Sequence, residues 1–311
     1  MGEKFIGVDI GGSSTRAALV SNKGKVLKFF STETNAKGKR KEVLENICSA
    51  ISAVFPKKEK IKAIGIGCPG AVDSEKGKIL YNNTIPSLSN FGLRKFIQKK
   101  FKAKTFCSND AAVNIFGEAL IGAGKKFNKV VGITLGTGIG SGIVLDKKIY
   151  IGANGITPHF GHMTINPLGP RCSCEKYGCW EEFVSIRAIL KRAEWAIENK
   201  KTIMKKMWPL ASEKVDIAAR KGDKEAIAIM KETAYYLGIG LANIANGLMP
   251  DAIIIGGGLS NSRILLKEGE KEMKKRLFYP KVKTKVLKGR LGNKAGAIGA
   301  ALFALEKSKR K

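Results

Sequence analysis

The stretch that decides the fold opens the chain: Phe5-Ile-Gly-Val-Asp9-Ile-Gly11-Gly12-Ser13-Ser14. Its apolar first half predicts a β-strand, Gly11 to Ser14 predict a tight turn, and residues 15–20 predict a second strand that pairs with the first. Loops of glycine and small hydroxyl residues let phosphate oxygens approach the backbone closely, so this turn is a candidate phosphate loop. Asp9, just before it, is placed either to hold a water of a Mg²⁺–triphosphate or to stabilise its own turn.

A second hairpin of the same kind lies in the middle of the chain. The strands expected at residues 130–135 and 142–145 flank Gly136-Thr137-Gly138-Ile139-Gly140-Ser141. Because a strand and not a helix follows, the glycines do not form a dinucleotide-binding fingerprint, and no Gly-x4-Gly-Lys-Ser/Thr motif is present. Two such hairpins suggest an internal duplication. A third glycine loop, Gly256 to Gly258, follows an apolar strand expected at residues 251–255.

The remaining pattern alternates strands and helices, as expected of an α/β protein. Further strands are expected at residues 26–31, 61–68 and 105–107, and helices at 42–55, 94–102, 110–121, 181–206, 217–219, 224–246 and 295–305.

Asn109 and Asp110 form a polar pair where a strand meets a helix. Asp110 is either a helix cap or a general base, because a carboxylate in a cleft can take the proton from a substrate hydroxyl that attacks phosphorus.

Half of the six cysteines lie close behind one of the two histidines: His162, Cys172, Cys174 and Cys179. Three thiolates and one imidazole are the number and type of ligands that tetrahedral Zn²⁺ prefers, so we expect a structural zinc site. The alternatives are a group of buried cysteines, or a disulfide, which needs an oxidising compartment.

The composition narrows the class of protein. With 311 residues, 44% of them hydrophobic, the chain is long enough for two soluble domains. Its 56 basic and 26 acidic residues give a net charge of +30, but the lysines are spread along the chain and aromatic residues are few. We therefore expect no specific nucleic-acid partner. No apolar run is long enough to span a membrane and no signal sequence is recognised, so we expect a cytoplasmic protein without a membrane partner.

Taken in order, these motifs resemble the repressor/open-reading-frame/kinase (ROK) family of sugar kinases over almost the whole chain. The resemblance implies an α/β protein with the actin-like ATPase (hexokinase or ribonuclease H-like) fold, in which two domains close an interdomain cleft over ATP and a sugar. We expect a domain of residues 1–116 and 295–311 and another of residues 117–294. The implied activity is ATP- and Mg²⁺-dependent phosphorylation of the primary hydroxyl of a hexose, by a dimer or tetramer.

The resemblance also assigns roles by position. Asp110 resembles the catalytic base. Gly70, Asn109, His159, His162 and Glu181 match the sugar side of the site, and His162 with Cys172, Cys174 and Cys179 match the structural zinc site. The nucleotide side corresponds to Asp9, Gly11, Gly12, Ser13, Ser14, Gly136, Thr137, Gly138, Gly257 and Gly258.

Two positions depart from the family pattern: Ser14 replaces a usual lysine, and His159 replaces a usual glutamate. Neutral imidazole offers one donor and one acceptor where a carboxylate offers only acceptors, so an N-acylhexosamine such as N-acylmannosamine competes with glucose as the expected substrate. His159 alternatively only orders its loop. Repressors of the family carry a DNA-binding segment before the first phosphate loop, which here begins at residue 9, so we expect a catalyst, with a non-catalytic sugar-binding regulator as the alternative.

Overall fold

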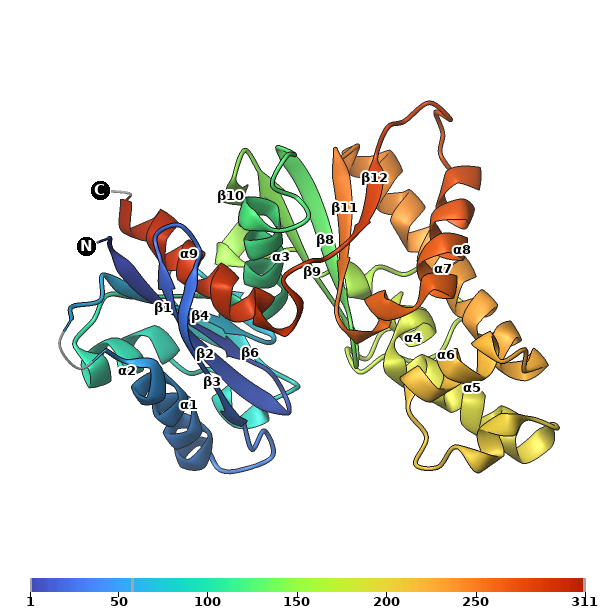
Figure 1. Cartoon of the computed structure of the whole chain (residues 1–311), viewed down its shortest axis with the longest axis horizontal. Helices are drawn as coiled ribbons and strands as arrows, with labels where there is room; N and C mark the ends of the chain where they lie inside the picture. Colours follow the sequence, from blue (N-terminus) through green and yellow to red (C-terminus); the bar gives the residue numbers. More distant parts are fainter. Residues whose placement is uncertain (1, 57–58, 310–311) are drawn as a thin grey trace. The chain divides into compact units, whose positions relative to one another are not determined.

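The computed structural model describes residues 2–56 and 59–309 and contains two mixed sheets of five strands each (Figure 1). The first sheet has the order β3 (Val26–Glu33), β2 (Ser14–Ser21), β1 (Lys4–Ile10), β4 (Ala63–Cys68) and β7 (Thr105–Asn109). The neighbours β1, β4 and β7 run parallel, whereas β2 is antiparallel to both β1 and β3. The carboxyl ends of the three parallel strands therefore meet at one edge of the sheet.

The second sheet repeats this order. It consists of β10 (Lys148–Ile149), β9 (Ile139–Leu145), β8 (Lys129–Leu135), β11 (Ala252–Gly256) and β12 (Lys285–Lys288). When the five strands of each sheet are numbered in chain order, both sheets have the spatial order 3-2-1-4-5. The duplication that the two glycine hairpins suggested therefore extends to whole sheets. A two-stranded sheet of β5 (Ala71–Asp73) and β6 (Lys78–Tyr81) follows β4.

Strand β1 is buried on both faces, which explains its nearly continuous apolar sequence. Ile6, Val8 and Ile10 belong to the larger apolar core of the first sheet, while Phe5 packs with small residues of the last helix, α9 (Ala295–Lys309). The glycine in the middle of β1 permits close packing: a Cβ on Gly7 would lie 1.8 Å from a carbonyl oxygen of α9. The C-terminal helix thus lies directly on the first sheet, as the family resemblance implied.

The helices agree with the sequence predictions except in three places: residues 181–206 are not one helix, the helix predicted at residues 217–219 spans residues 212–220, and the helix at residues 263–275 was not predicted. The helix predicted over residues 181–206 is wrong, because the backbone breaks at Ser185, whose side chain accepts a hydrogen bond from Ala188 N at 3.3 Å. That capping contact starts a new helix. The α-helices are α1 (Arg40–Val54), α2 (Leu93–Phe101), α3 (Asp110–Ile121), α4 (Glu181–Val184), α5 (Ile186–Asn199), α6 (Ser212–Arg220), α7 (Lys224–Leu248), α8 (Arg263–Lys275) and α9. The short 3-10 helices are η1 (Pro86–Leu88), η2 (Ala153–Gly155), η3 (Phe160–His162), η4 (Ile203–Lys206), η5 (Gly258–Asn261) and η6 (Gly292–Lys294).

The chain forms two compact units. The first consists of the residues up to Gly132, residues 141–158 and the residues from Gly289 onward, and the second of residues 133–140 and 159–288. The expected domain boundaries, after residues 116 and 294, stay a prediction. Within residues 2–56 and 59–309, none of the helices combines the length and apolar character needed to cross a membrane.

Candidate active site

The first glycine hairpin lies at the carboxyl edge of the first sheet. Gly11 N donates to Ser14 O at 2.9 Å and closes the turn between β1 and β2, and Thr34 N donates to Ser13 O at 3.2 Å. Asp9 stands at the end of β1, with its carboxylate 3.6 Å from the guanidinium of Arg16. Burial, and next the nearby Asp110 carboxylate, raise the pKa of Asp9 to about 7, although Arg16 acts in the opposite direction.

Asp110 lies at the same edge, because β7 ends at Asn109 and α3 begins at Asp110. The helix cap is Asn109: its Oδ1 accepts a hydrogen bond from Ala112 N at 3.1 Å, and its Nδ2 donates to Gly70 O at 3.2 Å. Gly70 has a φ of +90°, which favours glycine at that turn. Asn109 and not Asp110 is therefore the N-cap of α3, and the general-base role of Asp110 stays a prediction.

The carboxyl of Asp110 is held in a low-dielectric environment. Burial raises its pKa to about 6, and hydrogen bonds from the backbone N–H groups of Ala111 and Asp110 and from the Asn109 side chain act against that rise. The carboxyl groups of Asp9 and Asp110 therefore both have raised pKa values, and the charge of Asp110 contributes to the rise at Asp9. Buried carboxyls with raised pKa values are a common mark of catalytic and cation-binding sites.

The second glycine hairpin belongs to the second unit and is held from one side by Glu181. Gly136 N donates to Gly138 O at 3.0 Å between β8 and β9, and Ile139 N donates to Glu181 Oε2 at 3.4 Å. A Cβ on Gly138 would lie 2.7 Å from that same oxygen, whereas a Cβ on Gly136 would meet no atom within 4 Å. The backbone at Gly136 is therefore open to a ligand, as a phosphate loop requires.

The third glycine loop follows β11 and packs against the end of β8. Gly257 has a φ of +82°, and a Cβ there would lie 2.2 Å from Leu135 O. Gly258 begins the 3-10 helix η5, where Ser260 Oγ donates to Gly257 O at 2.7 Å. The structure thus brings this loop next to β8, the strand that leads into the second glycine hairpin.

The four predicted zinc ligands come together. One ligand atom from each of His162, Cys172, Cys174 and Cys179 lies within 4.8 Å of all the others. His162 Nδ1 is 3.7 Å from Cys172 Sγ, and Cys174 Sγ is 3.5 Å from Cys179 Sγ. Ligands around a tetrahedral Zn²⁺ stand about 3.3–3.8 Å apart. The donor types and their spacing therefore match zinc, and all six cysteines of the chain are free of disulfide bonds.

Glu181, one of the predicted sugar ligands, is buried and connects these parts. Its Oε1 accepts from Cys172 Sγ at 3.3 Å and lies 3.3 Å from Arg187 Nη2, while Oε2 accepts from Ile139 N. The carboxylate thus joins the cysteine loop to the second glycine hairpin.

Arg187 is a residue that the sequence analysis missed. Its Nε donates to Thr137 O at 3.1 Å, and its Nη2 lies 3.3 Å from both Glu181 Oε1 and Glu182 Oε1. The neighbouring Ile186 N donates to Gly136 O at 2.9 Å. In sequence, Arg187 looks like an ordinary polar residue at the start of a helix, because the contacts that give it a role come from a loop 50 residues away.

His159, at the family's glutamate position, has a polar atom without a partner. Its Nε2 is buried and makes no hydrogen bond within the described residues. Burial and next the neighbouring His162, whose ring centroid is 6.3 Å away, lower the pKa of His159, so its imidazole is neutral at pH 7. A buried polar atom without a partner costs free energy, and a ligand hydroxyl or amide would relieve that cost.

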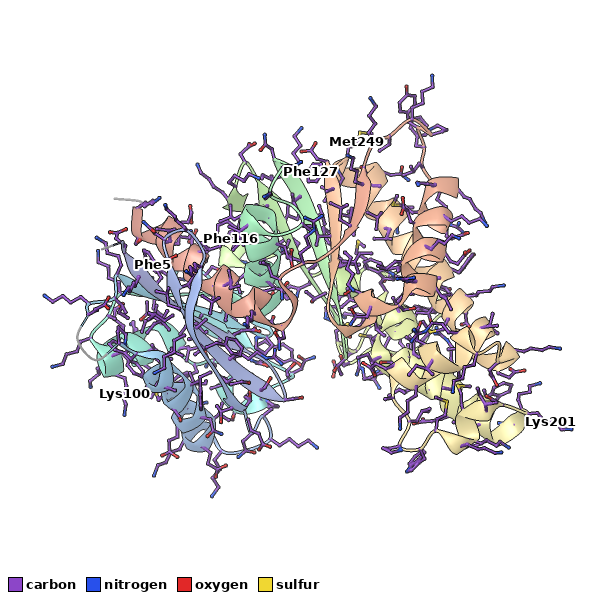
Figure 2. The ribbon with its side chains drawn as sticks, viewed as in Figure 1. Phe5, Lys100, Phe116, Phe127, Lys201 and Met249 are labelled. Carbon is purple, nitrogen blue, oxygen red and sulfur yellow. The ribbon has the colours of Figure 1, made fainter. Side chains whose placement is uncertain are left out.

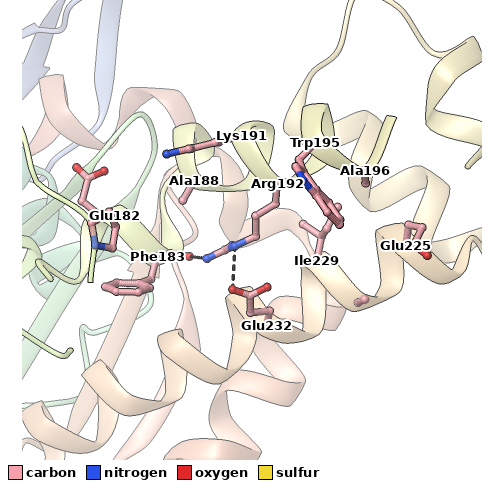
Figure 3. Close-up of a pocket in the computed structure, with 12 residues that line it drawn as sticks. Glu182, Phe183, Ala188, Lys191, Arg192, Trp195, Ala196, Glu225, Ile229 and Glu232 are labelled. Atoms are coloured by element: carbon pink, nitrogen blue, oxygen red, sulfur yellow. Dashed lines mark hydrogen bonds and ion pairs between the residues drawn. The ribbon is translucent and has the colours of Figure 1, made fainter. Parts of the chain in front are cut away.

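A separate pocket of about 480 Å³ lies between α5 and α7 (Figure 3). Arg192 points into it from α5, pairs with Glu232 at 3.0 Å and donates to Phe183 O at 2.8 Å. None of the predicted site residues lines this pocket.

The two five-stranded sheets with glycine hairpins at the ends of their strands define the class, the actin-like fold of hexokinase-type proteins. The ROK family model matches residues 5–307, so the chain belongs to the ROK family. It is 32% identical to a glucokinase of Thermotoga maritima, over 98% of each chain.

Two further relatives carry different named functions. The crystal structure of a ROK family glucokinase from Streptomyces griseus, in complex with glucose and AMPPNP, has a TM-score of 0.86 at 31% identity, covering 97% of this chain and 99% of that one. A xylose repressor of Bacillus spizizenii is 29% identical over 97% of this chain, which spans 77% of the repressor.

Proposed function

We propose that this protein phosphorylates the primary hydroxyl of a hexose, with glucose as the first candidate, and that Asp110 is its general base. A ROK member that matches glucokinases over nearly its whole length is an ATP-dependent sugar kinase. The observation that carries the finer proposal is the placement of Asp110, a half-buried carboxyl with a pKa of about 6 at the same sheet edge as Asp9 and the first glycine hairpin.

Asp110 has the proton affinity that the reaction needs. With a pKa of about 6 the carboxyl is mostly ionised at pH 7, yet it holds a proton more strongly than an exposed aspartate does. As the sugar oxygen attacks the γ-phosphorus, its O–H bond breaks and the proton passes to Asp110. The new O–P bond forms while the bond from phosphorus to the ADP oxygen breaks, so charge and atoms balance.

The nucleotide side consists of the two glycine hairpins and Asp9. Gly11 to Ser14 and Gly136 to Gly138 offer backbone N–H groups to phosphate oxygens, and Gly257 and Gly258 offer a turn for the adenosine. The donor set suits Mg²⁺, because Asp9 and Asp110 offer the carboxylate oxygens that this cation prefers, and the Asp110 carboxylate raises the pKa of Asp9. Asp9 would help to hold the Mg²⁺, which would supply neutralisation of the phosphate charge.

On the sugar side we assign Gly70, Asn109, His159, His162 and Glu181. The thiols of Cys172, Cys174 and Cys179 with His162 Nδ1 are suited to hold a structural Zn²⁺, which would fix the loop that carries His162. Their role is positioning, since no zinc chemistry enters the transfer step.

A second candidate substrate is an N-acylhexosamine, favoured by His159. The buried, unpartnered Nε2 of this neutral ring fits a neutral amide or hydroxyl partner, and it lacks the two charged acceptors of the usual glutamate. We further propose that the enzyme works in the cytoplasm, where ATP is available, as a homo-oligomer.

The test is a sugar screen with ATP and Mg²⁺, in which ADP release is coupled to NADH oxidation. Glucose, mannose, fructose, allose, N-acetylglucosamine and N-acetylmannosamine are compared by kcat/KM, with His159→Glu as the matched variant. We expect glucose to lead and His159→Glu to increase the ratio of glucose to N-acetylmannosamine. ADP release with none of the six, together with calorimetric sugar binding, would show a regulator instead of an enzyme.

A further inference from the structure

The end of the second unit that carries the connection from α8 to β12 exposes large apolar side chains. Phe278 is 90% exposed, Met249 58%, Tyr279 53% and Leu248 47%. Figure 1 shows the connection as a loop that extends beyond the ends of α8 and β12, and Figure 2 labels Met249 at the same end. We call Leu248, Met249 and residues 274–285 the apolar-basic tip.

Hydrogen bonds hold the two parts of the tip side by side. Asn246 Nδ2 donates to Arg276 O at 2.9 Å, and Phe278 N donates to Asn246 Oδ1 at 3.0 Å. Farther along the loop, Thr284 Oγ1 donates to Pro250 O at 2.7 Å. The four apolar side chains therefore belong to one surface, although they are separated by almost thirty residues in the chain.

The same surface is strongly basic. Residues 274–285 contain six basic residues, Lys274, Lys275, Arg276, Lys281, Lys283 and Lys285, and no acidic one. Glu270 of α8 pairs with Lys274, and Glu272 pairs with Lys275 and Arg276. Asp251 directly precedes β11, the strand that pairs with β12. Lys281 and Lys283 are exposed and form no ion pair among the described residues.

We propose that the apolar-basic tip binds the surface of an anionic phospholipid membrane. Phe278, Tyr279, Leu248 and Met249 enter the boundary between headgroups and acyl chains, and the surrounding lysines contact the anionic headgroups. Exposed aromatic and aliphatic side chains beside lysines without an ion pair in the described part of the chain, here Lys281 and Lys283, are what such a surface requires, and they give part of the +30 net charge a function. Surface binding needs no spanning segment, so it is compatible with the absence of such a helix from the described residues.

Two other occupants fit the tip less well. A second copy of the chain, related by two-fold symmetry, would bring the same lysine-rich loop against itself, and like charges would repel. Nucleic acid would find phosphate contacts and two stacking rings, but Leu248 and Met249 have no aromatic face for a base. An acyl-chain boundary uses all four side chains.

The experiment measures binding of the full chain to vesicles of phosphatidylcholine alone and of phosphatidylcholine with roughly one-third phosphatidylglycerol. We expect binding to the anionic vesicles only, weakened as salt increases. Lys281→Gln with Lys283→Gln should weaken it about 25-fold, at about fivefold per lysine, and Phe278→Ser about tenfold. The matched control is Lys205→Gln with Lys206→Gln, an exposed pair elsewhere that removes the same charge and should change binding less than about twofold.

Phe278→Trp gives a readout independent of lost binding, because insertion shifts Trp fluorescence to shorter wavelength in the presence of anionic vesicles only. All these positions are exposed, so kinase activity and thermal stability should stay unchanged. The proposal is overturned by any of four results: no binding to anionic vesicles, an equal loss in the control pair, binding of single-stranded DNA in place of vesicles, or dissociation of an oligomer by Phe278→Ser.

Discussion

Replacing Asp110 by Asn is the perturbation that separates the proposed catalytic role from a structural one. The amide keeps the size of the side chain but cannot accept the proton of the attacking hydroxyl. We expect kcat to fall by about two to four orders of magnitude. Sugar affinity, measured by calorimetry, should change by less than about threefold, since the other assigned sugar ligands are kept.

The same variant should be more stable than the unmodified protein at neutral pH. Burial raises the pKa of Asp110 from an ordinary value of about 3.9 to about 6, so the ionised carboxylate costs the free protein about 3 kcal/mol. The amide carries no charge to desolvate, but it has one acceptor oxygen in place of two and so keeps fewer of the hydrogen bonds from Ala111 N–H, Asp110 N–H and Asn109, which offsets part of the gain. The expected net increase in the free energy of unfolding is about 1–3 kcal/mol.

The pH dependence of this gain has a defined sign. A carboxyl whose pKa is raised in the folded state binds its proton more tightly there than in the unfolded state, so its destabilising effect grows from about pH 4 to pH 6 and is complete above that. The advantage of Asp110→Asn should therefore be present at pH 7.5 and vanish near pH 4. The substitution also removes the Asp110 charge that raises the pKa of Asp9, and this change likewise stabilises the variant at neutral pH.

Urea unfolding of the ligand-free proteins at pH 4, 5, 6 and 7.5 measures the difference, with the coupled assay run in parallel. Asp146→Asn, an exposed aspartate in the turn between β9 and β10, is the matched control and should change neither property. Near-normal turnover of Asp110→Asn would refute the general base. A stability difference that is the same at pH 4 and pH 7.5 would refute the raised pKa of the Asp110 carboxyl.

Three further variants test the second unit. Cys174→Ser should lower the zinc content measured by elemental analysis and raise the sugar KM about tenfold, with a smaller effect on ATP; unchanged kinetics in zinc-free protein would contradict this coupling. Arg187→Gln should raise the KM for ATP about tenfold because Thr137 loses its support, whereas Arg220→Gln, an exposed control, should not. Gly138→Ala should lower kcat/KM about tenfold or more, since the new methyl meets a Glu181 oxygen; wild-type kinetics would show that the loop has room to move.

Local signals were sufficient to predict most of the fold. The helix at residues 110–121 was predicted with its observed ends because a polar cap directly precedes its apolar residues. The strand–turn–strand signals of both glycine hairpins also predicted the observed strands to within a few residues. By contrast, α8 and β12 were not predicted, because their many lysines and glutamates leave only a weak apolar periodicity. Both elements are stabilised by tertiary contacts, α8 with α7 and β12 with β11.

The candidate site could be predicted only where residue type and spacing indicate one kind of chemistry. A histidine followed by three closely spaced cysteines indicates a metal site, and the ligand atoms of the four residues lie close together in the structure. The resemblance assigned Asn109 to the sugar. In the structure its side chain caps α3 and donates to Gly70 O, and from the sequence the capping role could equally have belonged to Asp110. Arg187 could not be predicted, because its role depends on a loop that becomes its neighbour only after folding.

Each compact unit of the free protein keeps polar groups in an unfavourable state. In the first unit the pKa values of Asp9 and Asp110 are raised, and in the second His159 Nε2 is buried without a hydrogen-bond partner among the described residues. Such groups lower the stability of the folded chain, so their joint presence is not explained by folding alone. A cation–triphosphate complex beside the two carboxyls and a polar sugar group beside the imidazole would each remove a penalty already present before binding. Under the proposed function, part of the binding free energy comes from relief of those penalties, which would offset the stability that asparagine at residue 110 is expected to add.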